Sequence, residues 1–174
     1  TLLLGGIGAL GVVVALVDAL FPVPLERLEG RAPSVLVLDA EDQPLRAFLA
    51  ADDHWRMPVT LDEVPAELVE ALLAIEDRRF RWHPGVDPLA VLRAAASNLR
   101  AGERVSGAST LPMQVARMAG RGPRTWRSKL IEARWALQLG LHRSRDEILE
   151  LYLNHAPFGG NLEGIGAASW FYFG

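Results

Sequence analysis

Residues 76–87 have the sequence EDRRFRWHPGVD, a stretch rich in arginine and aromatic side chains that separates two expected helices. Before it, Asp62 and Pro65 open a helix whose apolar positions 68, 69, 72 and 73 share one face, the spacing of a helix that packs on a core. After it, Asp87 and Pro88 form a helix-start signal, and this second helix is expected to end near Gly102. The stretch therefore predicts a loop between two helices.

Three more helices and one hairpin complete the expected fold. Ser109 can cap a helix that stops by Gly120, residues 124–141 form the longest helix, and Ser144 begins a capping box for a helix to Leu153. Upstream, residues 35–38 and 45–49 flank a polar turn and predict a small β-hairpin. The longest helix carries one apolar stripe, formed by Trp126, Leu130, Ala133, Leu137 and Leu141. We therefore expect a mainly α fold.

The composition narrows the function classes. The chain has 174 residues, a formal net charge of -3 and no cysteine, so it is long enough to bury a core without crosslinks. A disulfide framework, a cysteine zinc site and a thiol nucleophile are excluded for this sequence. The charge is uneven, because residues 78–145 hold thirteen arginines and one lysine against three acidic residues. This basic block predicts an anionic partner.

The first residues predict contact with a membrane. Residues 2–17 carry no polar side chain, although a spanning helix needs about 20 apolar residues. An anchor over residues 1–21 is the favoured interpretation, because the four glycines of the run would weaken a water-soluble helix more than one in lipid. A cleaved signal peptide and a buried core helix are the alternatives. Residues 22–60 are expected to form a linker with the hairpin, followed by the helical domain over residues 61–174.

Three segments carry candidate chemistry. Glu76 leaves an apolar helix face for the arginine-rich loop, which is compatible with a partly desolvated general base or with an ordinary ion-paired helix end. Small residues between Gly102 and Gln114 lead into a helix N-terminus, where they can bind an anion or form an ordinary cap. Lys129, the only lysine, lies one turn before Glu132. The two residues can form an ordinary ion pair on the helix surface. Alternatively, they belong to a cationic face that binds a pyrophosphate, where Glu132 holds a divalent cation.

Taken in order, these segments resemble the glycosyltransferase family 51 domain of class A penicillin-binding proteins, most closely the penicillin-binding protein 1C branch. The first family motif is similar to residues 76–87, and the second to Gly107-x-Ser109-Thr110 with Gln114. The third is similar to Lys129-x-x-Glu132, the fourth to residues 148–154 and the fifth to residues 164–174. The order and spacing of all five motifs make the resemblance specific, and it runs from about residue 20 to the last residue.

The resemblance implies a lysozyme-like, mainly α glycosyltransferase domain, incomplete at its C-terminus and held at the outer face of the bacterial cytoplasmic membrane by one N-terminal transmembrane helix. It implies polymerisation of lipid II into peptidoglycan glycan strands. Glu76 would be the general base, and the second catalytic residue, Glu132, would lie at the donor pyrophosphate and position a divalent cation, Mg²⁺ or Mn²⁺. The residues implied to bind substrate are Asp77, Phe80, His83, Gly85, Ser109, Thr110, Gln114, Arg117, Arg127, Lys129 and Asn154.

Three positions depart from the family pattern. Ser128 stands where the family usually has arginine, Pro112 replaces a threonine, and Met113 replaces the first of two glutamines, a change that also resembles the 1C branch. The proline is compatible with a helix only in its first turn. These departures concern the contacts to the donor pyrophosphate and leave the implied base in place.

The resemblance also implies partners and a longer protein. The partners are lipid II, the growing glycan, the membrane and other cell-wall synthesis or division proteins, whereas nucleic acid is not expected because the arginines form no single exposed stripe. The family domain continues past the fifth motif, and no Ser-x-x-Lys transpeptidase motif is present, so these residues are expected to be inactive or poorly folded alone. A lytic enzyme of the same fold class and a non-enzymatic scaffold that binds lipid II are the alternative functions.

Overall fold

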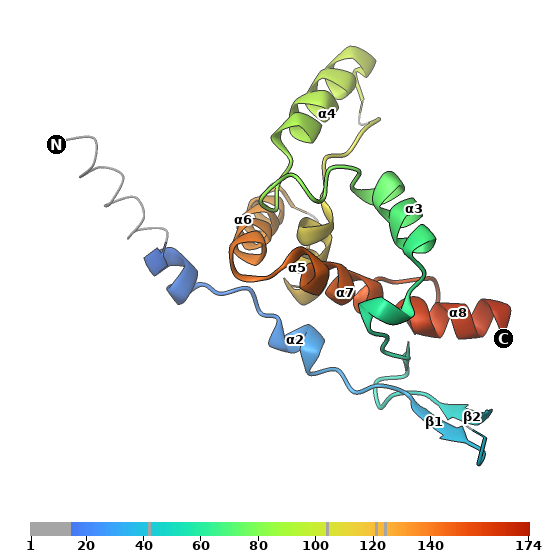
Figure 1. Cartoon of the computed structure of the whole chain (residues 1–174). Coiled ribbons are helices and arrows are strands. Elements are labelled where there is room, and N and C mark those ends of the chain that lie inside the picture. Colours follow the sequence, from blue (N-terminus) through green and yellow to red (C-terminus); the bar gives the residue numbers. More distant parts are fainter. Residues whose placement is uncertain (1–14, 42, 104, 121, 124) are drawn as a thin grey trace.

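The computed structural model describes residues 15–41, 43–103, 105–120, 122–123 and 125–174. Its centre is α5 (Leu111–Gly120), which contacts both α6 (Trp126–His142) and α7 (Arg145–His155) (Figure 1). α3 (Ala66–Glu76) and α4 (Pro88–Ala101) precede them in the chain, and α4 projects away from this centre. α8 (Ile165–Phe173) follows α7 and leads to the C-terminus. The predicted mainly α fold is confirmed.

The hydrophobic core lies between the inner faces of α3, α5 and α7. Leu28 of α2 (Glu26–Glu29), a short helix that the sequence analysis did not predict, closes it from the N-terminal side. Burying a leucine, isoleucine or phenylalanine side chain stabilises a fold by about 1.5–3 kcal/mol. The largest fully buried side chains are Phe80, Leu28, Leu111, Leu139, Ile148, Leu149, Leu153, Val115 and Pro112.

Two helix starts follow their sequence signals. Asp87 caps α4, because its Oδ1 accepts a hydrogen bond from the backbone N–H of Ala90 at 3.0 Å. Ser144 and Glu147 form the predicted capping box at the start of α7. Both signals depend on side chains within three residues of the helix start, so the local sequence is sufficient to predict them.

The starts of α3 and α5 differ from their predictions. Asp62 lies in a separate single-turn 3₁₀ helix (Leu61–Glu63), and α3 begins only at Ala66. Thr110 rather than Ser109 caps α5, since its Oγ1 accepts a hydrogen bond from the backbone N–H of Met113 at 3.3 Å. Pro112 therefore lies in the first turn of α5, where a backbone N–H has no intrahelical acceptor and its absence does not weaken the helix.

The apolar stripe of α6 faces solvent. Trp126 is 88% exposed, Leu130 72% and Leu141 66%. The helix instead turns Ala136, Gln138 and Leu139 inward. The repeat of apolar residues therefore predicted the helix but not the face that packs, because the buried face is offset from the apolar stripe.

The strands form two small sheets. β1 (Val35–Leu38) and β2 (Pro44–Phe48) pair antiparallel as the predicted hairpin, which projects from the helical body (Figure 1). In the second sheet, which was not predicted, β3 (Trp55–Arg56) pairs in parallel with β4 (Leu162–Glu163). This sheet joins segments that are distant in the sequence, so no local pattern indicates it.

A buried carboxylate joins segments before and after the helical core at this second sheet. Glu163 is 6% exposed and accepts a hydrogen bond from Arg31, while His155 Nδ1 and Arg56 Nε each lie 2.9 Å from its carboxylate oxygens. Burial alone would raise the pKa of Glu163, but hydrogen bonds with His155, Arg31 and Arg56 lower that pKa to about 2. Glu163 is therefore ionised at neutral pH and holds Arg31 and Arg56 against β4.

The predicted anchor falls mostly on residues 1–14, which lie outside the described residues. Residues 15–20 are helical. Within the described part of the chain, no helix combines the length and the apolar character needed to cross a membrane. The anchor stays a prediction.

Candidate active site

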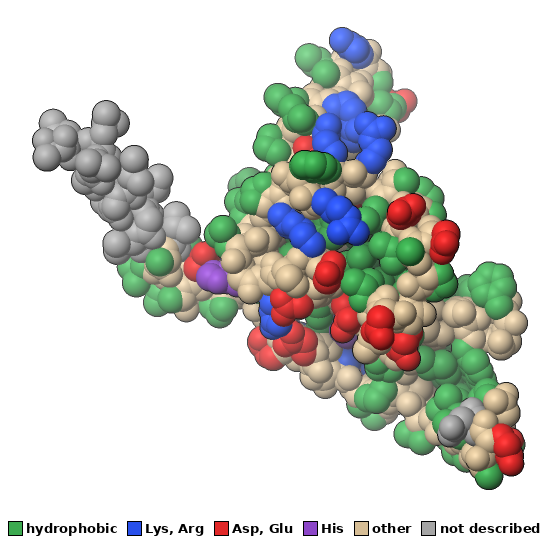
Figure 2. All heavy atoms as spheres, in the orientation of Figure 1, with side chains coloured by type: hydrophobic (Ala, Val, Ile, Leu, Met, Phe, Trp, Pro, Cys, Tyr) green, Lys and Arg blue, Asp and Glu red, His purple; other side chains and the backbone are tan. Residues whose placement is uncertain are grey.

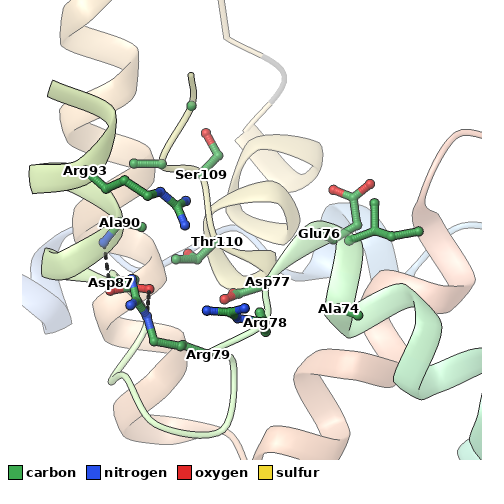
Figure 3. Close-up of a pocket in the computed structure, with 13 residues that line it drawn as sticks. Ala74, Glu76, Asp77, Arg78, Arg79, Asp87, Ala90, Arg93, Ser109 and Thr110 are labelled. Carbon is green, nitrogen blue, oxygen red and sulfur yellow. Dashed lines mark hydrogen bonds and ion pairs between the residues drawn. The ribbon is translucent and has the colours of Figure 1, made fainter. Parts of the chain in front are cut away.

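A cavity of about 220 Å³ opens where the end of α3 meets α4 and the loop before α5 (Figure 3). Residues 74–79, the first turns of α4 and residues 107–110 line it. Three arginines line the cavity: Arg78, Arg79 and Arg93. Arg79 donates a hydrogen bond from Nε to Asp87 Oδ2 at 2.7 Å. Figure 3 shows Glu76 and Arg93 on opposite sides of it. The cavity therefore has a carboxylate on one side and a basic wall on the other.

Glu76, the predicted base, ends α3 with an exposed side chain. Gln114 of α5 donates a hydrogen bond from Nε2 to Glu76 Oε2 at 2.9 Å. Burial raises the pKa of Tyr152 to about 12, and the negative charge of Glu76 contributes to this rise. The amide of Gln114 thus orients the carboxylate, which stays accessible to a hydroxyl group as a general base requires.

The second and third motifs meet at Lys129. Its Nζ donates hydrogen bonds to Ser109 Oγ at 2.7 Å and to Glu132 Oε2 at 2.9 Å. Ser109 lines the cavity, and the Glu132 side chain is only 13% exposed. The pair is therefore more than a solvated ion pair on a helix surface, because it joins α6 to the cavity and places an ammonium group at its rim.

Asp77 is buried directly beside the exposed base. Its carboxylate accepts hydrogen bonds from His83 Nε2, at 3.0 Å and 3.1 Å from its two oxygens, and from the backbone N–H of Leu111 at 2.9 Å. Asp77 is 7% exposed and His83 is 5% exposed. These side chains bind the loop after Glu76 to the start of α5. His83 lies inside the protein, and Asp77, although it borders the cavity, is almost fully buried.

The rest of the first motif packs the same loop against α6. Gly85 is buried with φ 132°, and a Cβ there would lie 2.0 Å from the carbonyl oxygen of Ala136, so only glycine permits this approach. Thr110, 2% exposed, donates its hydroxyl hydrogen to the Gly85 carbonyl oxygen. Phe80 is 1% exposed and lies 5.7 Å below the Arg145 guanidinium. The burial of Phe80 and Gly85 argues against direct contact of these two residues with a substrate. Thr110 borders the cavity, but its hydroxyl group is already bonded to Gly85.

Asn154 also has a partner within the protein. Its Oδ1 accepts a hydrogen bond from the backbone N–H of Val59, and its Nδ2 donates one to the carbonyl oxygen of Val59, both at 2.8 Å. The amide thus fixes the segment before the 3₁₀ helix onto α7. Because both ends of the amide bind Val59, this geometry supports a structural role for Asn154 and not a contact with the substrate.

Part of the basic block is exposed to solvent. Arg117 on α5 and Arg127 on α6 are both exposed and lie outside the residues that line the cavity. Figure 2 shows Lys and Arg side chains gathered over α4 and the surface beneath it, whereas acidic side chains dominate around α2, α3 and α7. An anionic group that approaches this face therefore meets positive potential first.

Three residues of the site were not predicted. Arg78 and Arg93 line the cavity, and Tyr152 lies within the electrostatic influence of Glu76. Arg78 and Tyr152 lie within the residue ranges of the first and fourth motifs, which give neither of them a role of its own. No local signal distinguishes Arg93 from the other arginines of the basic block.

The predicted divalent cation has one candidate ligand at this site. Glu132 shares its Oε2 with Lys129, and the described residues contain no group of three His, Cys, Asp or Glu side chains suited to a metal. Mg²⁺ commonly takes one or two carboxylates and completes its coordination with substrate phosphates and water. The donor set therefore fits a cation that arrives with a phosphate and contacts Glu132, and does not fit a metal centre built from protein ligands alone.

Comparison with known proteins places the chain in a family. A model of the family described as transglycosylase matches residues 41–174. The chain is 49% identical to penicillin-binding protein 1C of Escherichia coli (strain K12) over 157 residues, which cover 90% of this chain and 20% of that protein. It is 46% identical to penicillin-binding protein 1A of the same organism over 120 residues, 68% of this chain and 14% of that protein.

A more distant relative covers nearly the whole chain. Penicillin-binding protein 1A of Aquifex aeolicus (strain VF5) is 35% identical over 178 residues, which cover 97% of this chain and 24% of that protein. The chain thus spans a quarter or less of the length of these three relatives. The family match includes residues of all five motifs and covers well over half of the chain. The chain therefore belongs to the transglycosylase family.

Proposed function

We propose that this chain is the glycosyltransferase part of a class A penicillin-binding protein and that it polymerises lipid II into peptidoglycan glycan strands. The observation that carries the proposal is the separation of two charged groups at one cavity. Glu76 is an exposed, oriented carboxylate, and Lys129 is a cation hydrogen-bonded to Ser109 at the cavity rim. This arrangement suits a reaction in which a hydroxyl group attacks at one point while an anionic group leaves at another.

In the proposed reaction, Glu76 takes the proton from the 4-hydroxyl group of the acceptor lipid II. The resulting oxygen attacks the anomeric carbon of the growing chain and forms the new glycosidic bond. The bond from that carbon to the pyrophosphate oxygen breaks, and its electron pair leaves with undecaprenyl pyrophosphate. Attack from the face opposite the leaving group inverts the configuration. Gln114 holds the carboxylate for this step through its hydrogen bond to Oε2.

Lys129 and the surrounding arginines stabilise the departing pyrophosphate. Fixed charges aimed at developing negative charge are often the largest single catalytic contribution, and one such donor is worth about 10²–10³ in rate. Arg117 and Arg127, both exposed near this face, contribute to phosphate or sugar binding. Mg²⁺ or Mn²⁺, when bound between the pyrophosphate and Glu132, would add further charge neutralisation. Glu132 also holds the Lys129 ammonium in place.

Several residues of the first two motifs do not take part in the reaction but position Glu76. Asp77, His83 and Gly85 are positioning residues, because their contacts hold the loop after Glu76 against α5 and α6. Thr110 and Phe80 support the same loop from within. In this proposal a change at any of these five residues acts through the placement of Glu76.

The location and partners follow from the proposed substrate. The apolar run at residues 2–17 would tether the domain to the bacterial cytoplasmic membrane, with the site on the outer face where lipid II is used. The growing glycan would bind at the same site, and other cell-wall synthesis or division proteins would act with the longer protein. The relatives are four or more times as long as the matched segments, which leaves room for further domains in such a protein.

A lytic enzyme with a single catalytic glutamate is the second candidate. Cleavage of a neutral glycan requires a general acid but no cation at a departing pyrophosphate. The contact of Lys129 with Ser109 therefore favours the transferase. A scaffold that only binds lipid II would use the basic face but would not need the carboxylate of Glu76.

The test compares the full-length protein with its Glu76→Gln variant on lipid II, with and without a divalent metal ion. Loss of the general base is expected to slow polymerisation by about 10²–10⁴, measured as product length against time. Glu70→Gln, an exposed carboxylate on the same helix, is the matched control and should polymerise like the unchanged protein. Equal polymerisation by the Glu76→Gln and Glu70→Gln variants would refute the base assignment. Shortening of glycan without any lipid-linked substrate would instead support the lytic enzyme.

A further inference from the structure

The back of α6 carries a second set of polar contacts that the proposed reaction does not use. Arg134, Gln138 and His142 are spaced four residues apart, so they share one face of the helix. All three approach residues 17–23, the segment that follows the apolar run at the N-terminus. We name these three residues the docking stripe.

Gln138 is the centre of the docking stripe. It is 7% exposed, and both ends of its amide are occupied. Its Nε2 donates a hydrogen bond to the carbonyl oxygen of Asp18 at 3.0 Å, and its Oε1 accepts one from the backbone N–H of Val23 at 2.9 Å. A buried amide with both partners satisfied fixes one geometry, because any other position leaves polar groups without hydrogen bonds.

Arg134 binds the last turn of the same segment. It donates hydrogen bonds to the carbonyl oxygens of Val17, at 3.4 Å, and of Phe21. The Val17 carbonyl oxygen also accepts a hydrogen bond from the backbone N–H of Phe21 at 3.0 Å. The Phe21 carbonyl lies past the helix end, where carbonyl groups lack intrahelical partners and carry partial negative charge that a guanidinium group satisfies. His142 Nε2 lies 4.0 Å from a carboxylate oxygen of Asp18 and extends the contact by one turn.

The opposite face of α6 carries the charged group of the site. Lys129 donates hydrogen bonds to Ser109 and to Glu132. A helix with 3.6 residues per turn places Lys129 about 180° and Glu132 about 120° around the axis from Gln138. The separation of nine positions between Lys129 and Gln138 corresponds to about 13.5 Å along the axis. One rigid helix thus holds the N-terminal segment on one side and the cationic group of the cavity on the other.

We propose that the docking stripe fixes the end of the N-terminal apolar segment on α6 and thereby sets where a lipid-linked pyrophosphate meets Lys129 and Glu132. The proposal rests on the proposed function, in which the segment is a membrane tether and the substrate is lipid-linked. Arg134, Gln138 and His142 are positioning residues, since none of them lines the cavity. A substrate held in the same membrane as the tether depends on this geometry, whereas a substrate free in solution does not.

The test has two readouts on the full-length protein in phospholipid vesicles. The first is the distance between spin labels at Leu20→Cys and Leu141→Cys, two exposed positions on either side of the contact, with any cysteine outside this chain replaced. The second is the polymerisation rate with long-chain lipid II in the vesicles and with a short-chain, detergent-soluble lipid II. The variant is Arg134→Met with Gln138→Leu, which keeps side-chain volume but removes the hydrogen bonds.

The unchanged protein is expected to give one narrow label distance, and the double variant a broad one. A small misplacement of reacting groups slows catalysis by up to about a hundredfold, so we expect the vesicle rate to fall between about ten- and a hundredfold while the rate with soluble substrate stays unchanged. Arg46→Met on β2, an exposed arginine outside the basic block, is the matched control and should change neither readout.

Three results would overturn the proposal. They are a broad distance distribution in the unchanged protein, a narrow one in the double variant, and an equal loss of rate with both substrates, which would indicate a merely structural role. If the unchanged protein polymerises neither substrate, the proposed function fails. The claim that the docking stripe positions the substrate then fails as well. The label distance then still decides whether the stripe docks the segment.

Discussion

Replacing Asp77 with alanine is expected to loosen the loop after Glu76 without touching the carboxylate of Glu76 itself. Asp77 accepts hydrogen bonds from two buried donors, His83 Nε2 and the backbone N–H of Leu111. Each buried donor left without an acceptor costs about 1–3 kcal/mol, so the loss lies at about 2–6 kcal/mol. Water that enters the vacated space would satisfy one donor, which favours the lower value of about 2 kcal/mol.

Hydrogen exchange of peptides that span residues 77–87 and 108–113 measures this loss locally. Because about 1.4 kcal/mol corresponds to a factor of ten, the Leu111 amide should exchange about 30-fold faster in Asp77→Ala than in the unchanged full-length protein. Asp146→Ala, an exposed carboxylate in the first turn of α7, is the matched control and should leave these peptides unchanged.

Kinetics separate the two roles of Asp77. A positioning residue affects the orientation of Glu76, so kcat for polymerisation should fall more than KM rises. If the Leu111 amide exchanges in Asp77→Ala as it does in the unchanged protein, the hydrogen-bond argument is refuted. If KM rises while kcat stays constant, Asp77 binds substrate directly and its burial in the free protein has been misinterpreted.

Substitutions at three further places test the charge at the cavity, the buried carboxylate and the close approach at Gly85. Lys129→Met should lower kcat/KM by about 10²–10³, because a fixed cation is lost. Arg127→Met should lower kcat/KM less. Both effects are measured as initial rates on lipid II. The pKa of Glu163 is lowered to about 2 from 4.5, so its contribution to stability is complete above pH 4.5 and is lost as the pH falls toward 2. Glu163→Gln should remove this pH dependence, and at pH 7 the unpaired partners should destabilise the fold by up to about 3–5 kcal/mol, as measured by urea unfolding. Gly85→Ala should abolish folding or lower the melting temperature far more than Gly102→Ala, since a Cβ at Gly85 would lie 2.0 Å from a backbone oxygen whereas nothing lies within 4 Å of one at Gly102. Similar melting temperatures for the two alanine variants would contradict the steric argument.

Much of the helical layout could be predicted because its signals are local. Asp87 and Ser144 begin helices through hydrogen bonds that span three residues, and the hairpin of β1 and β2 joins neighbouring strands. The exposed stripe of α6 shows where such reasoning ends. A periodic apolar pattern indicates a helix, but the face that packs depends on which neighbours arrive, and here Gln138 meets the N-terminal segment while Trp126 stays exposed.

The sequence alone determined the family motifs, their order and the residue types available for chemistry, since these require only the chain itself. The tertiary structure decided which of these residues meet. Gln114 reaches Glu76 across 38 positions, and Lys129 reaches Ser109 across 20. It also showed that Asp77, with His83 as its partner, turns inward. Side-chain direction follows from packing between distant segments, and no pattern along the chain specifies that packing.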